Sequence, residues 1–202
     1  MLTLSTLAFV LIVITAMVIL VFRDWRVNAG ALAAQYLAAF ALVTLSWPIG
    51  MSIVKLIVGW MATATIALTC LRQKESEPSS EPAASLFLRG LSGLLVILVI
   101  FILAPNLREN IFPKLDLVIV QGGLMLLGMA LMQLGTNSDP YLTIISLLSL
   151  LSGFEIIHAG LEISTLLTGL LAIVNLGLAL VGVYFIAKTS EQEETTASGE
   201  ES

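Results

Sequence analysis

Residues 2–22 read LTLSTLAFVLIVITAMVILVF, and this stretch decides the fold class. It carries no charged side chain, and as a helix rising 1.5 Å per residue it would span about 30 Å, the thickness of the hydrocarbon core of a bilayer. Arg23 and Arg26 follow it. A secretory signal peptide has its positive charge before the apolar segment and a small-residue cleavage site after it. The stretch therefore predicts a retained membrane-spanning helix.

The composition extends this prediction to the whole chain. Of its 202 residues, 58% are hydrophobic and only 11% are charged, whereas soluble domains average about 25% charged residues. Strands with open edges would leave backbone N–H and C=O groups unpaired in lipid, so the spanning segments must be helices. The sequence predicts an all-α, polytopic transmembrane helical bundle of about seven spans.

Seven apolar segments are long enough to cross a bilayer. Most are separated by charged residues, by prolines or by polar residues. The boundary between the last two rests only on His158, Gly160 and Glu162, but residues 141–187 are too long for one span. The expected spans are residues 2–22, 29–46, 50–71, 86–104, 115–135, 141–160 and 163–187.

Two polar segments divide the chain. Residues 72–85, RQKESEPSSEPAAS, have the composition of a linker, and residues 189–202 form an acidic tail without large apolar side chains. Such segments bury too little apolar surface to fold by themselves. We therefore expect a three-helix membrane segment at 1–71, a cytoplasmic linker at 72–85, a four-helix membrane segment at 86–188 and a disordered tail at 189–202.

The basic residues indicate an orientation. With seven spans, six basic residues in loops lie on the side of the linker and two lie on the other side, and the positive-inside rule places the richer side in the cytoplasm. We expect a multi-pass protein of the cell (inner or cytoplasmic) membrane with its N-terminus outside and its C-terminus in the cytoplasm. The six are Arg23, Arg26, Arg72, Lys74, Arg89 and Lys188, and the two are Arg108 and Lys114.

Several function classes are disfavoured. No basic tract is present to bind nucleic acid. The single cysteine, Cys70, excludes an internal disulfide and a multi-cysteine metal site, and the single histidine, His158, excludes a bis-histidine haem within this chain. No nucleophile–base arrangement, phosphate loop or nucleotide motif is found. We expect a chain that is not an enzyme and holds no cofactor, with the lipid bilayer as its main partner.

Residues 153–164, GFEIIHAGLEIS, place Glu155, His158 and Glu162 in this apolar setting. A charge at mid-membrane costs about 2.5–3.5 kcal/mol, so such residues usually pair or line a pathway, and we expect Glu155 to face protein. In one interpretation the three carry protons, and Asn175 and Gln121 extend the path. In the other, Glu155 pairs with His158, and Glu162 only marks a loop.

Lys55 and His158 also allow other interpretations. Lys55 lies about two turns from Trp47, which marks a membrane boundary, so its side chain is expected to reach the surface. Glu155 and His158 have the spacing of a di-iron ligand pair, but that site needs two such pairs and two further glutamates. A lone histidine could also ligate a chlorophyll, although nothing else in the sequence supports that.

Residues 150–164, LLSGFEIIHAGLEIS, resemble the K subunit of complex I and component E of hydrogenase-4-type complexes. That family has a helix of the form Gly-x-Glu-x-x-x-Asn-Ala and then a helix with a second buried acid. Gly153 and Glu155 match the first positions, and Ala159 lies close to the family's alanine. Asn175 stands near the place of the second acid and cannot carry a proton, which is a departure from the family.

The resemblance implies a non-catalytic integral subunit of a proton- or sodium-translocating oxidoreductase complex, beside larger antiporter-like subunits. Two alternatives remain. One is a small secondary transporter or channel, for which we would expect inverted repeats or helices broken at mid-membrane. The other is a scaffold subunit of a pigment or respiratory membrane complex.

Overall fold

The computed structural model describes residues 2–72, 83–137 and 139–200. These residues form seven helices and no strand, and all seven helices are long and apolar enough to cross a membrane. The predicted all-α transmembrane bundle is confirmed. The helices are α1 (Leu2–Val21), α2 (Trp25–Val43), α3 (Ile49–Arg72), α4 (Ala83–Asn110), α5 (Leu117–Thr136), α6 (Pro140–Leu161) and α7 (Thr165–Glu200).

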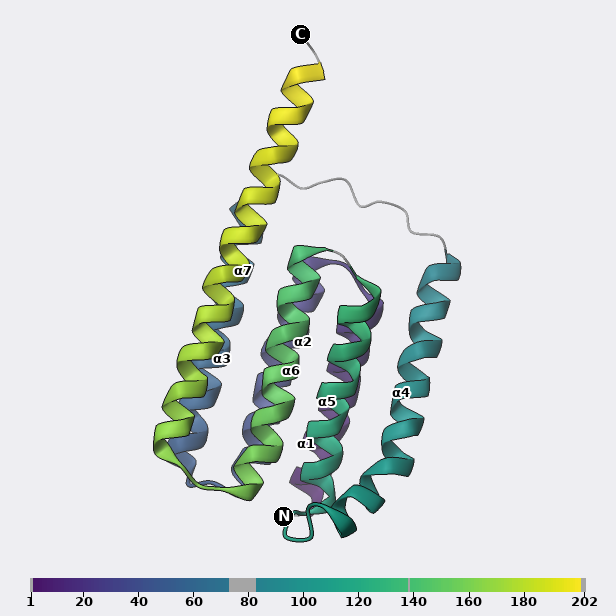
Figure 1. The fold of residues 1–202 in the computed structure, drawn as a ribbon, viewed down its shortest axis with the longest axis vertical. Helices are drawn as coiled ribbons and strands as arrows, with labels where there is room; N and C mark the ends of the chain where they lie inside the picture. The colour runs from purple at the N-terminus through teal and green to yellow at the C-terminus, as the bar shows by residue number, and fades with distance from the viewer. Residues whose placement is uncertain (1, 73–82, 138, 201–202) are drawn as a thin grey trace.

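The helices form two layers (Figure 1). One layer contains α1, α2 and α3, and the other contains α5, α6 and α7. Across the layers α1 contacts α5, α2 contacts α6, and α3 contacts α7, while α4 packs at one edge against α1 and α5. Residues brought together from α2, α3, α6 and α7 therefore come from both halves of the chain.

The two layers have the same topology. Helices α5, α6 and α7 begin at residues 117, 140 and 165, which is 115, 115 and 116 residues after the starts of α1, α2 and α3 at 2, 25 and 49. Each helix runs in the same direction as its partner across the layers (Figure 1). We call α1–α3 the first unit and α5–α7 the second unit. They form a parallel arrangement, with α4 as the connection, and not an inverted one.

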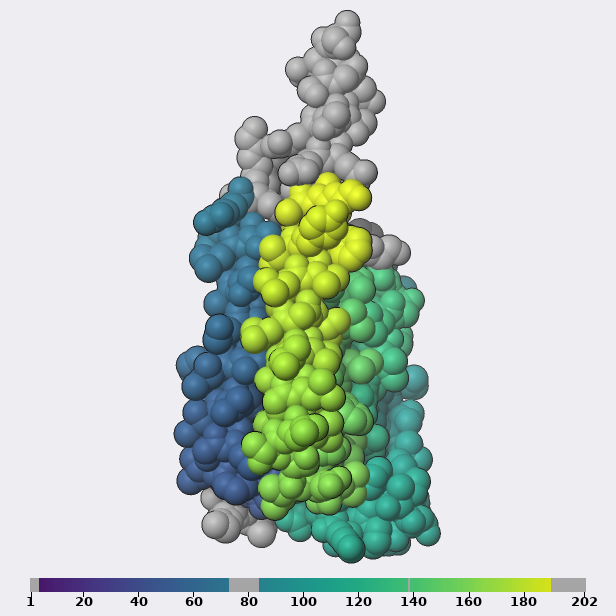
Figure 2. Space-filling model, turned by 60° about the vertical axis from the view of Figure 1, so that its left-hand side comes forward, coloured from purple at the N-terminus to yellow at the C-terminus, as the bar shows by residue number. Residues whose placement is uncertain are grey.

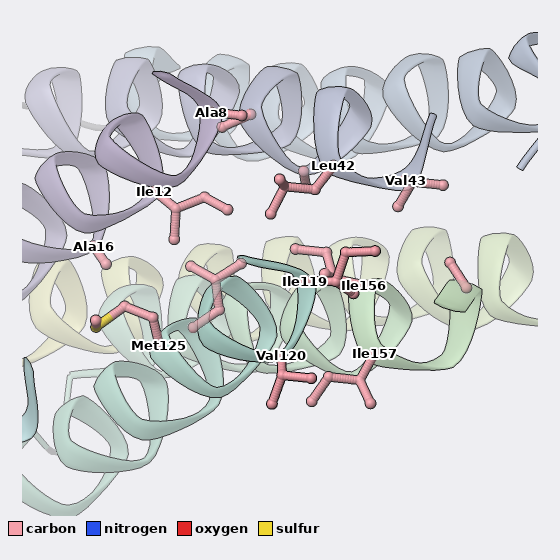
Figure 3. Close-up of a cluster of buried hydrophobic side chains, with 14 of the residues drawn as sticks. Ala8, Ile12, Ala16, Leu42, Val43, Ile119, Val120, Met125, Ile156 and Ile157 are labelled. Atoms are coloured by element: carbon pink, nitrogen blue, oxygen red, sulfur yellow. The ribbon is translucent and has the colours of Figure 1, made fainter. Parts of the chain in front are cut away.

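The largest apolar core lies between the layers on the side of α1 and α5. Ile12 of α1, Leu42 of α2, Met125 of α5 and Ile156 of α6 are all fully buried in it (Figure 3). In lipid the hydrophobic effect does not drive helices together. Van der Waals contacts between closely packed apolar side chains are therefore a main source of their attraction.

Glycines bring α5 and α6 into direct backbone contact. A Cβ atom added to Gly153 of α6 would lie 2.7 Å from the Gly123 oxygen of α5, and one added to Gly123 would lie 2.9 Å from the Gly153 oxygen. Only residues without a side chain permit this approach, which is the usual role of glycine between membrane helices. The contact fixes the rotation of α6 two residues before Glu155.

Two helix boundaries differ from the sequence prediction. Helix α4 continues through Pro105 and ends at Asn110, although the expected span ended at residue 104. Proline removes one helical hydrogen bond and bends a helix without always ending it. Helix α2 starts at Trp25 and not at residue 29, because the Asp24 carboxylate accepts a hydrogen bond from the Arg26 N–H at 2.9 Å and caps the helix.

The polar segments also differ in part. Helix α7 continues to Glu200, through most of the tail that we expected to be disordered. A chain that is already helical adds residues at little cost, and glutamate, glutamine and alanine favour the helix. Residues 201–202, and residues 73–82 of the expected linker, lie outside the described residues. At the linker's two ends, Arg72 closes α3 and Ala83 opens α4.

Candidate functional site

A buried ion pair joins the two units. The Lys55 ammonium group of α3 contacts the Glu155 carboxylate of α6, and the two side chains are only 4% and 8% exposed. Lys55 belongs to the first unit and Glu155 to the second. The pair is thus a contact between units and not within one.

The pair lies inside the membrane-spanning part of both helices. Lys55 is six residues after the start of α3 and Glu155 is six residues before the end of α6, so each lies about 9 Å along its helix from the same end of the bundle. At that end the Trp47 indole N–H donates a hydrogen bond to the Glu162 carbonyl at 3.2 Å. This bond links the α2–α3 loop to the α6–α7 loop.

A second polar contact lies beside the pair. The Tyr36 hydroxyl of α2 donates a hydrogen bond to the Asn175 side-chain oxygen of α7 at 3.0 Å, and the tyrosine is completely buried. The Lys55 nitrogen lies 5.9 Å from the centre of the Tyr36 ring, within the range of a cation–π interaction. Four helices therefore contribute to one polar cluster made of Tyr36, Lys55, Glu155 and Asn175.

Small residues make room for this cluster. A Cβ atom added to Gly59 of α3 would lie 2.2 Å from the Tyr36 ring. The tyrosine can reach Asn175 across α3 only because Gly59 has no side chain. The Ser152 hydroxyl of α6 lies near the Tyr36 hydroxyl on the same side.

A small pocket adjoins the ion pair. It is lined by Lys55 and Glu155 together with residues of α7 that include Thr168 and Asn175. Its volume, measured as the space that the centre of a water molecule can occupy, is about 10 Å³. This is roughly enough for one water. Helix α7 covers the site, since it lies between α3 and α6 on this face of the molecule (Figure 2).

The electrostatics of the pair follow from its burial. An isolated charge in this environment would be strongly unfavourable, and mutual attraction offsets that cost for both groups. The two atoms in contact, Lys55 Nζ and Glu155 Oε2, have no further hydrogen-bond partner among the described residues. Each charge consequently depends on the other, and a change in one must affect the other.

Glu155 lies where the sequence indicated, but with another partner. It is buried in protein beside a polar group, as predicted. That group is Lys55 and not His158, which one of the two interpretations of the sequence paired with Glu155. Lys55 was expected to extend toward the membrane surface, and this prediction is wrong, because Lys55 points into the bundle and is 6% exposed. A signal was available in α3, where Ser52, Lys55, Gly59 and Thr63 share one buried face at helical spacing.

The other candidate residues are dispersed. His158 is half-buried with its ring 6.0 Å from that of Phe154, and its Nδ1 atom has no hydrogen-bond partner among the described residues. Glu162 is exposed and ends α6, where its N–H bonds to the His158 carbonyl. Asn175 joins the polar cluster. Gln121 is half-buried on α5 and does not line the pocket.

No protein-family model, curated protein or solved structure matches the chain. Among the residues that the structure describes, no three His, Cys, Asp or Glu side chains gather as they would around a metal ion. The buried charges of the chain itself are therefore the features from which a function can be inferred.

Proposed function

We propose that this chain is a non-catalytic integral subunit of an energy-converting, proton- or sodium-translocating oxidoreductase complex, and that Lys55 and Glu155 take part in proton movement. The observation that carries the proposal is the ion pair, with both charges inside the membrane span. Ionisable residues at such depth usually belong to ion or proton pathways. The resemblance of residues 150–164 supports the class of complex.

The pair couples protonation to side-chain movement. A proton that reaches a Glu155 carboxylate oxygen removes the negative charge, and Lys55 then loses its counter-ion. The flexible four-carbon stem of lysine lets its ammonium group move toward the nearby end of α3, where water is available. Release of the proton restores the carboxylate and draws Lys55 back. Arrival of a proton and displacement of Lys55 are therefore two parts of one step.

Two features of the chain support a role as a subunit. Almost all described residues lie in helices or short loops, so the chain offers little mass outside the membrane for redox chemistry. Helix α4 is the least buried span and exposes its apolar surface along most of its length. In the proposed assembly, α4 or α7 faces larger antiporter-like subunits.

The parallel units favour a second candidate, a small secondary transporter. Some transporters are built from parallel repeats and bind substrate between them near mid-membrane. The pocket at Lys55 and Glu155 lies between the two units, but it has room for roughly one water. Helices α3 and α6, which line it, are continuous and are not broken at mid-membrane as in many transporters. Purification from native membrane separates the candidates, because a subunit brings other integral proteins with it and a transporter does not.

The test of proton movement compares Glu155, which is buried in α6, with Glu162, which lies at the end of the same helix. In vesicles that hold the native assembly, Glu155→Gln should sharply lower coupled proton uptake per assembled complex. The amount of assembled complex is measured alongside, because Lys55 loses its counter-ion in this variant and the chain is less stable. Glu162→Gln is the matched control and should change little, because Glu162 is exposed at the end of α6. Equal uptake by Glu155→Gln and the unaltered protein would refute the role in proton movement.

The orientation is proposed from the distribution of basic residues. The cytoplasmic membrane, with the N-terminus outside and Lys188 near the cytoplasmic surface, satisfies the positive-inside rule. A reporter protein fused after residue 202 should be active only in the cytoplasm. Activity on the outer face would reverse the orientation.

A further inference from the structure

Helix α6 carries unusual serines beyond Glu155. Ser152 and Ser149 follow at intervals of three residues, so each is about 4.5 Å further along the axis, away from the Trp47 end. Ser152 is 1% exposed and Ser149 is 5% exposed. The Ser149 hydroxyl has no hydrogen-bond partner among the described residues, and the nearby Tyr36 hydroxyl is the one polar group that Ser152 approaches among them. Serine in a membrane helix usually donates to the carbonyl four residues earlier. Ser146 does so, to Leu142 at 2.7 Å.

A glutamine of α2 shares this property. Gln35 is 1% exposed, and both its amide nitrogen and its oxygen lack hydrogen-bond partners in the described part of the chain. It lies eight residues before the end of α2, and Ser152 lies nine residues before the end of α6. Since α2 and α6 contact each other and run in the same direction, the two residues are at nearly the same depth.

A second pocket continues the series. Ser149 and Gln133 of α5 line it together with residues of α1, and its space for a water-sized molecule is again about 10 Å³. The Gln133 amide nitrogen donates to the Ile19 carbonyl at 3.0 Å. Gln133 is three residues before the end of α5. The two pockets therefore lie toward opposite ends of the bundle, and α6 passes both.

Buried polar groups without partners cost free energy unless water satisfies them. We propose that the two pockets hold ordered waters, and that these waters, with Ser149, Ser152 and Gln35 between them, form a hydrogen-bonded path along α6 from the Lys55–Glu155 pair to Gln133. As a route for protons the path rests on the proposed function, but the presence of water does not. Each pocket has the size and the polar lining that one water requires.

The path can conduct protons without further reactants. Water and a serine hydroxyl each donate and accept, so a proton accepted on one side is matched by a proton given up on the other. Each transfer breaks one O–H bond and forms another. The amides of Gln35 and Gln133 orient water but do not themselves pass protons. At the end of the path nearest Trp47, Glu155 accepts or releases the proton.

The first experiment measures water contact directly. Cys70 is the only cysteine, so Cys70→Ala gives a chain without thiols. Ser149→Cys, Ser152→Cys and Ser146→Cys are then made singly, and the full chain is reconstituted in lipid vesicles. The infrared S–H stretching band reports exchange after transfer to heavy water, and the amide bands of the same spectrum verify helix content.

The path predicts that cysteines at 149 and 152 exchange at least about tenfold faster than at 146, where exchange requires local opening of the helix. Equal rates at the three positions would overturn the inference. Slow exchange at either 149 or 152 alone would also overturn it, because the path would be interrupted.

A second experiment asks whether the path carries protons. Ser149→Leu fills the second pocket and should lower coupled proton uptake several-fold in vesicles that hold the native assembly, whereas Ser146→Ala should leave uptake unchanged. Unchanged proton uptake in Ser149→Leu would show that the path does not carry protons. Fast thiol exchange together with no effect of Glu155→Gln on uptake would keep the hydrated path and reject the proposed function.

Discussion

The two three-helix units follow the same course through the membrane but bury different groups. The first unit contributes a cation, Lys55, and the second contributes an anion, Glu155, with Asn175 beside it. Among the described residues, neither unit buries a second charged side chain that could neutralise its own. The interface between the units is therefore specified by charge as well as by shape, because only the correct pairing offsets the cost of burying both charges.

The units also differ in how their helices approach one another. In the second unit α5 and α6 meet backbone to backbone at Gly123 and Gly153. In the first unit the large Tyr36 ring of α2 fills the space left by Gly59 of α3. The second unit therefore holds Glu155 on a closely packed, rigid pair of helices. The Lys55 side chain of the first unit is long and flexible, and it is the member of the pair that can move.

The largest expected effect comes from breaking the charge pair between the units. Lys55→Met leaves the Glu155 carboxylate buried without a partner and should lower the free energy of unfolding by about 3–5 kcal/mol. Adding Glu155→Leu to the same chain should recover most of this loss, since two apolar side chains can replace a buried pair. Reversible unfolding in mixed micelles measures both variants.

The control is Lys114→Met, which removes an exposed lysine and should have little effect. If the double variant were as unstable as Lys55→Met alone, the pairing of charges would not be what connects the two units.

The next effect tests the close packing of the second unit. Gly153→Ala places a Cβ atom 2.7 Å from the Gly123 oxygen and should cost about 1–3 kcal/mol, because α5 and α6 must move apart. Gly169→Ala meets nothing within 4 Å, so it should be neutral or slightly stabilising, as alanine favours a helix over glycine. Thermal unfolding in detergent should show a clear loss of stability for Gly153→Ala and no loss for Gly169→Ala. Equal effects would mean that the glycine contact is not tight in the membrane.

Much of the fold could be predicted from the sequence, because span length and charge depend on local composition. The boundaries that failed depend on more than composition. Pro105 stays inside α4 because a helix can lose one hydrogen bond and continue. The tail after residue 189 joins α7 because an existing helix extends easily.

The site was predicted only in part, for a physical reason. The cost of charge in lipid identified Glu155 from the sequence. Its partner Lys55 was not identified, because helical periodicity reveals neighbours on the same helix, such as His158, and not those on another helix. Lys55 was missed because distance from a helix end gives depth but not rotation. The serines of α6 were visible in the sequence, but the lack of a hydrogen-bond partner at Ser149 among the described residues is apparent only in three dimensions.

A smaller effect tests the polar contact between Tyr36 and Asn175. Tyr36→Phe removes the hydroxyl that donates to Asn175, and buried hydrogen bonds between membrane helices are worth about 0.6 kcal/mol on average. We expect a loss of this size in unfolding free energy. Tyr184→Phe is the matched control, because Tyr184 is 62% exposed on α7, and it should change nothing. A neutral Tyr36→Phe would show that water replaces the hydroxyl.

The smallest expected effect is the difference in stability cost between two helix-capping aspartates, one in each unit. Asp24 and Asp139 cap their second helices in the same way, each accepting a backbone N–H two residues ahead at 2.9 Å, from Arg26 and from Tyr141. Asp24→Ala and Asp139→Ala should each cost about 1 kcal/mol of unfolding free energy, because each leaves an N–H at a helix start unsatisfied.

Asp116 provides the control, because it precedes α5 but its side chain makes no capping hydrogen bond. Asp116→Ala should therefore cost clearly less than the change at Asp24 or Asp139. If the two capping aspartates differ by more than about 0.5 kcal/mol, at the edge of measured cap effects, their shared geometry hides different environments. The two units would then be alike in topology but not in the energetics of their turns. Equal costs, with a silent Asp116, would show that both units begin their second helix by the same interaction.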